Sequence, residues 1–183
     1  PKKGFDGHGE IIKMEEVNTV YLSIGSNLGD RLSNLNAAIA LLKENNCTIL
    51  KASAVYESEA VGFESEDRFY NAALKIETKT NPIELLNTLK NIEKLLGRGP
   101  INKELGYQSR TIDLDIIFFN SLTLNHNDLI IPHPFFHERL FVLKPMIDII
   151  DPTEVLLVDL VQPHYIKAQG IQTIDETTFK LIH

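Results

Sequence analysis

The sequence has little cysteine, no tryptophan, a deficit of positive charge and no long hydrophobic run. Among its 183 residues, Cys47 is the one cysteine, which excludes an internal disulfide. No uninterrupted apolar segment approaches the roughly 20 residues needed to cross a bilayer. Residues 1–16 also lack the apolar centre of a secretory signal. We therefore expect an intracellular, cytoplasmic protein without membrane association, and an organellar location stays open.

The deficit of positive charge bears on the class of partner. The chain carries 18 Lys+Arg against 25 Asp+Glu, a formal net charge of -7. Sequence-blind binding to nucleic acid needs a cationic surface, so this class of partner is disfavoured. The hydrophobic content of 43% and charged content of 23% are typical of a globular domain. A polyanionic ligand would have to be bound by a local group of Lys, Arg or His side chains.

The chain divides into a short polar start and one long patterned region. Residues 1–18 are charged, contain glycine and show no periodicity, so we interpret them as a linker or as residues added by cloning. The length of the rest is close to that of one compact domain. We therefore expect a single domain over residues 19–183.

Apolar spacing and capping residues predict two helices. After the segment "GSNLGD", leucine and isoleucine recur at three- and four-residue intervals, with Asp30 or Asn27 available as the N-cap. A second helix is predicted between Asn81 and Gly97, because Glu84 completes a capping box and the glycine suits the left-handed stop position.

Runs of β-branched and aromatic residues predict four strands around these helices. The resulting order is β-α-β-β-α-β, which is the ferredoxin-like order, and the fold class is α+β. A hairpin and a helical segment follow the fourth strand, and they are expected to cover the second face of the sheet, giving a three-layer α-β-α sandwich. The predicted strands span residues 17–26, 47–58, 69–78 and 111–119.

The fourth strand contains acidic residues within an apolar run, "SRTIDLDIIFF". Successive side chains of a strand point to opposite faces, so Asp113 and Asp115 share one face while Leu114 and Ile116 occupy the other. Two such carboxylates suit Mg²⁺ that keeps water and substrate phosphates as its other ligands. The alternative is that the pair only solvates an exposed strand face, and the motif alone does not decide between them.

Cations and one aromatic-amide pair lie near this motif in the sequence. Phe69 is suited to stack on a flat ring, and the amide of Asn71 can both donate to and accept from a heterocycle edge. The alternatives are ordinary surface charges and an ordinary core aromatic. The cations suited to clamp phosphate oxygens are Arg98, Lys103, Arg110, His133 and Arg139.

Six ordered segments together resemble a known enzyme family. They are "GSNLGDRLSNL", "YESEAVG", "FYNAAL", "IEKLLGR", "SRTIDLDII" and "IPHPFFHERLFVL". In this order the chain resembles 6-hydroxymethyl-7,8-dihydropterin pyrophosphokinase of folate biosynthesis, over about residues 17–150. The resemblance implies transfer of pyrophosphate from ATP to the pterin hydroxyl, which attacks the β-phosphorus while AMP departs.

The resemblance also implies the roles of particular residues. Asp113 and Asp115 would hold two Mg²⁺ ions between ATP and the pterin hydroxymethyl group. Phe69 and Phe141 would sandwich the pterin, Asn71 would bond its edge, and Gly25 would lie close by. Backbone groups near Ser58 and Val61 would complete pterin recognition, whereas the ATP contacts would come from Glu93, Arg98, Arg110, Ile116, His133 and Arg139.

Two loops are expected to take part in this function, and three positions within them differ from the usual family sequence. The polar, glycine-containing segments 59–68 and 98–109 are expected to act as lids over the pocket. Ala60 and Ser109 stand where the family often has proline, and Pro100 stands where it often has a second arginine. These departures affect the expected loop conformations more than the metal site.

Two other classes of function remain as alternatives. One is a ferredoxin-like module that senses a metabolite without turnover, which would bind ligand but release no AMP. The other is a D-x-D transferase that uses nucleotide sugars in place of ATP. A pyrophosphokinase would need only small-molecule substrates, although linked or associated folate-pathway modules are also an open prospect.

Overall fold

The computed structural model describes most of the central part of the chain. The described residues are 16–59, 67–97 and 109–151, together with the backbone of 4–5, 11–12 and 172–173. Within them, no helix is both long and apolar enough to pass through a membrane.

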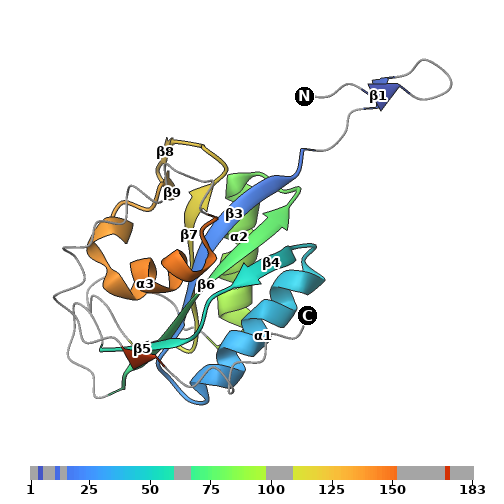
Figure 1. The fold of residues 1–183 in the computed structure, drawn as a ribbon. Helices are drawn as coiled ribbons and strands as arrows, with labels where there is room; N and C mark the ends of the chain where they lie inside the picture. Colours follow the sequence, from blue (N-terminus) through green and yellow to red (C-terminus); the bar gives the residue numbers. More distant parts are fainter. Residues whose placement is uncertain are drawn as a thin grey trace.

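The core elements follow the predicted order (Figure 1). The helices are α1 (Arg31–Glu44) and α2 (Pro82–Leu95). The strands are β3 (Asn18–Ser26), β4 (Thr48–Ala52), β5 (Tyr56–Ser58), β6 (Phe69–Thr78) and β7 (Asp113–Phe119). The α+β, ferredoxin-like prediction is confirmed.

Helix α2 begins at the predicted residue, and α1 begins after Asp30, one of its two candidate N-caps. Asp30 caps α1, because its carboxylate accepts a hydrogen bond from the Ser33 backbone N–H at 3.0 Å. Asn81 and Glu84 form the expected capping box of α2. Gly97 follows α2 with φ of 89°, a conformation that costs glycine little because it has no Cβ.

The sheet is antiparallel and has β3 at its centre. Strand β3 pairs with β6 on one side and β7 on the other. Strands β4 and β5 both pair with β6, and β10 (Gln172–Thr173) pairs with the outer edge of β5. Gln172 and Thr173 therefore lie at the sheet edge beside β5.

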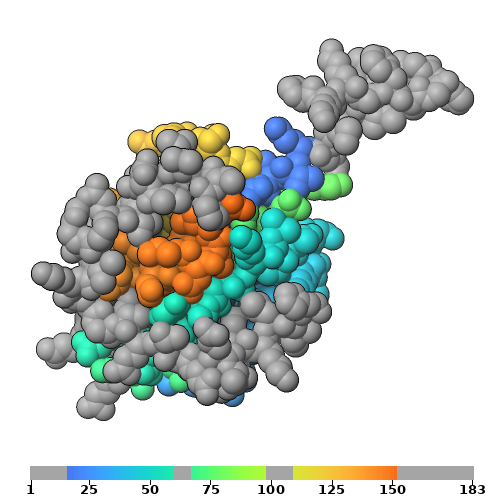
Figure 2. All heavy atoms as spheres, in the orientation of Figure 1, coloured from blue at the N-terminus to red at the C-terminus, as the bar shows by residue number. Residues whose placement is uncertain are grey.

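Alternate residues of these strands form two separate cores. One lies between the sheet and helices α1 and α2, and it contains Leu22, Leu74 and Leu114. The other lies on the opposite face, where Tyr21 and Phe118 pack against α3 (Leu140–Ile149). Figure 1 shows α3, in orange, in front of the sheet, and Figure 2 shows orange atoms at the surface on the same side. The predicted three-layer sandwich is confirmed.

The segment after β7 forms the expected elements, but one expectation was wrong. The hairpin was expected to cover the second face of the sheet together with the helical segment, whereas its residues Leu129 and Ile131 are buried in the core under α1 and α2. Strands β8 (Leu124–His126) and β9 (Leu129–Ile131) form the expected hairpin. A single turn of 3-10 helix, Phe136–Glu138, then leads into α3. This connection places the residues just before α3 beside β7.

The structure differs from the sequence-based expectations in two other places. Residues 47–58 were predicted as one strand, and this was wrong: they form two, because the Ser53 hydroxyl accepts a hydrogen bond from the Ala73 backbone N–H at 2.8 Å and interrupts the regular ladder. The start of the chain, for which no element was predicted, contains a short antiparallel pair, β1 (Gly4–Phe5) with β2 (Ile11–Ile12).

Candidate active site

The two acidic residues of β7 lie on the face of the sheet that α3 covers. Asp113 pairs across the ladder with Gly25, and Asp115 pairs with Ser23. Both carboxylate-bearing residues are partly exposed, whereas Leu114 between them is buried in the core under α1 and α2. The prediction that Asp113 and Asp115 share one face of β7 is therefore confirmed. The two side chains leave the strand next to each other on that face, at one end of β7.

Arg110 lies against the first of these carboxylates. Its Nη1 is 2.8 Å from Oδ1 of Asp113, and the two side chains are 17% and 25% exposed. A guanidinium in this position neutralises one carboxylate and still presents further N–H donors. Arg110 thus lies beside the Asp113 carboxylate, and its expected contact with ATP phosphates stays a prediction.

The backbone of Arg110 is held by a residue that was not predicted as part of the site. The side-chain oxygen of Asn27 accepts from the Arg110 backbone N–H at 2.6 Å, and its Nδ2 donates to Ser109 Oγ at 3.0 Å. The backbone N–H of Asn27 donates to the Arg110 carbonyl at 3.1 Å. Asn27 is 2% exposed, so these bonds form in a protected setting. They fix the approach of the chain to β7.

His133 reaches the same region from the segment before α3. Its backbone N–H donates to the Ile117 carbonyl at 3.1 Å, which attaches it to β7. Burial lowers the pKa of His133 to about 4, with repulsion from Arg139 adding to this and attraction to Asp113 opposing it. The imidazole is therefore neutral near pH 7, and it interacts electrostatically with both charged neighbours.

The tautomer of His133 follows from a local hydrogen bond. Its Nδ1 accepts from the Phe135 backbone N–H at 3.2 Å. The proton of the neutral ring is therefore on Nε2, which is then a donor suited to an anionic oxygen. Arg139 lies near two aromatic rings, with its Cζ 5.4 Å from the centroid of Phe135 and 5.8 Å from that of Phe141.

The residues expected to recognise a heterocycle gather on the same face, two strands away from the carboxylates. Asn71 Nδ2 donates to Ser58 Oγ at 2.8 Å, and both residues are buried. Gly25 lies opposite Asn71 in the ladder. A Cβ on Gly25 would stand 3.1 Å from Asn71 Oδ1 and 3.7 Å from the ring of Phe69. Glycine therefore keeps the space in front of this amide clear.

Two residues expected near the nucleotide have other surroundings. Glu93, which is 6% exposed, uses Oε1 to accept a hydrogen bond from the Leu114 backbone N–H at 2.8 Å. Glu93 thereby attaches α2 to β7. The side chain of Ile116 is packed in the core under α1 and α2, so it faces away from Asp115. Any contact from Ile116 to a ligand on the carboxylate face would have to come from its backbone.

Several predicted residues fall outside the described part of the chain. Of the lid segments 59–68 and 98–109, the structure describes only the ends, so their closure over the pocket stays a prediction. The site residues that lie outside the described ranges are Val61, Arg98 and Lys103.

The carboxylate oxygens of Asp113 and Asp115 suit a hard cation that takes only a few of its ligands from the protein. Among the described residues, no group of three or more His, Cys, Asp or Glu is close enough to hold a metal by itself. Two neighbouring carboxylates are the arrangement expected for Mg²⁺ that completes its octahedron with water and phosphate oxygens. The residues present therefore fit a magnesium ion that arrives with a phosphate-bearing ligand.

The sequence of the chain is similar to those of several known proteins. Residues 21–151 match the family model described as 7,8-dihydro-6-hydroxymethylpterin-pyrophosphokinase (HPPK). The chain is 43% identical over 138 residues to the Bacillus subtilis 2-amino-4-hydroxy-6-hydroxymethyldihydropteridine pyrophosphokinase, covering 75% of this chain and 81% of that protein. It is 44% identical over 136 residues to the bifunctional protein FolKE of Lactococcus lactis, covering 74% of this chain and 38% of that protein.

Solved structures share the fold. A Plasmodium falciparum HPPK-DHPS structure superposes with a TM-score of 0.60 at 17% identity, covering 81% of this chain and 46% of that one. An HPPK-DHPS structure determined in complex with substrates gives a TM-score of 0.56 at 19% identity, covering 73% of this chain and 40% of that one. The chain thus spans less than half the length of these longer relatives.

Proposed function

This chain belongs to the 7,8-dihydro-6-hydroxymethylpterin-pyrophosphokinase family, and we propose that it transfers the pyrophosphoryl group of ATP to the hydroxyl of 6-hydroxymethyl-7,8-dihydropterin. The reaction belongs to folate synthesis. The hydroxyl oxygen forms a bond to the β-phosphorus, the bond from that phosphorus to the bridging oxygen of the α-phosphate breaks, and AMP leaves. The hydroxyl proton is released, and the products are AMP and the pterin diphosphate.

One observation carries this proposal. Asn71, Gly25 and Asp113 stand in a single row across three neighbouring strands, all on the face that α3 covers. Strands are spaced by about 4.8 Å, so the amide and the carboxylate start roughly 10 Å apart. The glycine between them adds no side chain, which leaves room for a flat ring bonded at one edge by Asn71 and directing its substituent toward Asp113.

The proposed metal ligands are Asp113 and Asp115. Two Mg²⁺ ions bound there would draw the attacking and leaving oxygens together and offset the negative charge that develops in the transition state. The carboxylates fit this role because they are adjacent, partly exposed and few enough to leave positions for phosphate oxygens. The ion pair with Arg110 orients the Asp113 carboxylate before substrates bind.

The proposed phosphate contacts come from both sides of the carboxylates. Arg110 offers donors from the start of β7, and Arg139 offers them from the start of α3. His133 contributes a neutral Nε2–H donor, which binds a phosphate oxygen without bringing the desolvation cost of a buried cation. Arg98, Glu93 and the backbone of Ile116 complete the proposed nucleotide contacts on the basis of family resemblance.

The proposed pterin site consists of aromatic and amide groups. Phe69 and Phe141 would stack on the two faces of the ring, and Asn71 would bond its edge. The hydrogen bond from Asn71 Nδ2 to Ser58 Oγ orients the amide so that its oxygen points toward the space beside Gly25. Backbone groups near Ser58 and Val61 would supply the remaining contacts.

The longer relatives support a place beside other folate enzymes. One is named a bifunctional protein, and another, from Arabidopsis thaliana, is named a folate synthesis bifunctional protein. The matched region occupies 38% and 28% of those proteins, respectively. We include in the proposal that residues 19–183 form one pyrophosphokinase domain, able to work alone or linked to other pathway modules.

A direct assay tests the proposed reaction. Purified protein is incubated with ATP and Mg²⁺, with or without 6-hydroxymethyl-7,8-dihydropterin, and AMP and the pterin diphosphate are quantified by chromatography. The proposal expects equal amounts of both products, formed only when pterin and metal are present. Binding of ATP without AMP release would indicate a sensing module, and turnover of nucleotide sugars would indicate a D-x-D transferase.

A further inference from the structure

Helix α1 begins with an arginine that contacts the reverse side of the proposed pterin site. We propose that Arg31 is a positioning residue for pterin binding, acting through the β5–β6 pair from the opposite face of the sheet. This inference rests on the proposed function, since it concerns the same site. It assigns Arg31 an effect on one substrate, the pterin, and little effect on ATP.

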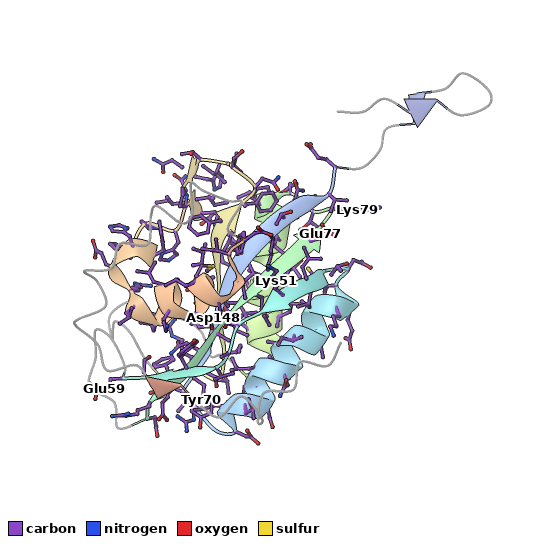
Figure 3. The ribbon with its side chains drawn as sticks, in the orientation of Figure 1. Lys51, Glu59, Tyr70, Glu77, Lys79 and Asp148 are labelled. Atoms are coloured by element: carbon purple, nitrogen blue, oxygen red, sulfur yellow. The ribbon has the colours of Figure 1, made fainter. Side chains whose placement is uncertain are left out.

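Three contacts attach Arg31 to the two strands. Its Nη1 donates to Glu57 Oε1 on β5 at 3.1 Å and to the backbone carbonyl of Arg68, just before β6, at 2.8 Å. Its Cζ lies 3.7 Å from the centroid of the Tyr70 ring on β6. Figure 3 shows Tyr70 at the end of the sheet where α1 begins. A single side chain therefore joins the start of α1 to both strands.

The register of these strands links the contacts to the pterin face. Glu57 pairs directly with Tyr70. Glu57 accepts a hydrogen bond from Arg31 at the start of α1, and Tyr70 packs against the core under α1 and α2. The next pair along the strands, Ser58 with Phe69, points to the α3 face. Because side chains alternate, the residues that Arg31 contacts are the immediate chain neighbours of those proposed to bind pterin.

The position of Arg31 is not explained by the stability of its own helix. It is the first residue of α1, where the helix dipole disfavours a positive charge, and the first turn contains no acidic residue. The opposing charge is supplied by Glu57, which is 24% exposed and also lies 3.9 Å from Arg68 Nη1. The arginine thus gains its favourable contacts from the sheet, not from α1.

The structure also indicates why the effect should be selective. The bond from Asn71 to Ser58 crosses the same two strands that Arg31 holds, so a small slip of β5 against β6 would turn the Asn71 amide. Hydrogen bonding is sensitive to such shifts in distance and angle. The carboxylates lie on β7, which pairs with β3 and is separated by that strand from the β5–β6 pair. The proposed metal ligands are therefore two strands away from β6, the nearer of the two strands that Arg31 joins.

The first experiment compares Arg31→Met with Lys90→Met, a matched loss of one exposed helix cation on α2. Steady-state kinetics are measured for each substrate at saturation of the other. We expect Arg31→Met to raise the KM for pterin by about tenfold, as for loss of one charge-assisted hydrogen bond, with the KM for ATP changed by less than about twofold. Lys90→Met should leave both constants unchanged. Equal increases for pterin and ATP, or none, would overturn the inference.

Two further variants separate positioning from general stability. Arg31→Lys keeps the charge near Glu57 but loses the planar contact with Tyr70, so its KM for pterin should fall between those of the wild type and Arg31→Met. Glu57→Gln combined with Arg31→Met should be no worse than Arg31→Met alone, because both changes break one contact. If Arg31→Met does not fold, Arg31→Lys and Glu57→Gln alone give the same test. Independent, additive effects of the two positions would contradict a shared role.

The positioning role of Arg31 can be tested separately from the proposed function by a measurement that needs no catalytic turnover. The side-chain amide resonance of Asn71, assigned with Asn71→Asp, is followed by NMR in the substrate-free protein. Arg31→Met should shift this resonance, and Lys90→Met should not. Absence of AMP formation by the wild type would refute the proposed function, whereas an unshifted Asn71 resonance would refute the positioning role of Arg31.

Discussion

The guanidinium of Arg110 lies 2.8 Å from the carboxylate of Asp113, three residues further along the chain. The ion pair forms where the chain enters β7, and the backbone of the arginine is fixed by Asn27, which directly follows β3. Arg110 is therefore placed both to balance the carboxylate and to offer donors to an incoming phosphate.

Removal of either carboxylate should almost abolish turnover. Asp113→Ala and Asp115→Ala are each expected to lower kcat/KM by at least about 100-fold, because a ligand lost from a shared ion misplaces both substrates. The fold should persist, since both side chains are partly exposed. Asp128→Ala, in the exposed β8–β9 turn, is the matched control. Near-wild-type turnover of Asp113→Ala or Asp115→Ala would contradict the metal assignment.

Magnesium should also be required for nucleotide binding. Isothermal titration of the wild type with a non-hydrolysable ATP analogue is expected to show tight binding with Mg²⁺ and weak binding with EDTA. Asp115→Asn keeps the shape of the side chain but removes its charge, so its binding should become nearly independent of Mg²⁺. Undiminished binding of the analogue by wild type in EDTA would argue against a metal between β7 and the phosphates.

Truncation of Asn71 should separate the two substrates. Asn71→Ala removes the amide proposed to bond the pterin edge and leaves the Ser58 hydroxyl without its 2.8 Å donor. We expect pterin affinity to fall by about tenfold or more, with ATP affinity changed by less than about twofold. Fluorescence titration of each ligand gives the comparison. Parallel losses for both ligands would show that Asn71 supports the fold and not a pterin contact.

The two described glycines at this end of β3 should respond differently to alanine. A Cβ at Gly25 would stand 3.1 Å from Asn71 Oδ1, so Gly25→Ala is expected to weaken pterin binding with little loss of stability. Gly29 has φ of 65°, and a methyl group there would meet no heavy atom within 4 Å, so Gly29→Ala should cost about 1 kcal/mol of stability without changing pterin affinity. Thermal unfolding and pterin titration test both, and the reverse pattern would contradict the proposed pocket.

Local sequence signals predicted the helix ends and the paired carboxylates, because caps and strand alternation act over a few residues. Asn81 with Glu84, and Asp113 with Asp115, are examples. Asn27 and Arg31 were not predicted as functional, because their partners lie 26 to 83 residues away. An asparagine just after a strand, or an arginine at the first position of a helix, is a signal only when the tertiary partner is known.

Acid should destabilise the protein partly through His133. The pKa of His133 is about 4 in the folded protein against 6.5 for an unperturbed histidine, so between these values the unfolded chain binds the additional proton. Stability contributed by keeping the ring neutral is therefore complete above about pH 6.5 and is lost as the pH falls toward 4. His133→Asn retains an acceptor for the Phe135 N–H but cannot titrate.

Urea unfolding of the metal-free protein from pH 7 to pH 4.5 measures this contribution. The wild type is expected to lose roughly 1–3 kcal/mol more than His133→Asn over that interval, a range that allows for partial solvent screening of the ring. His126→Asn is the control, because His126 is exposed and its Nδ1 accepts from the Asp128 N–H in the same local arrangement. Other groups titrate in all three proteins, so the difference between variants isolates the imidazole. Identical slopes for wild type and His133→Asn would mean that His133 is not held neutral by its surroundings, and a neutral donor to the phosphates would then have to be sought elsewhere.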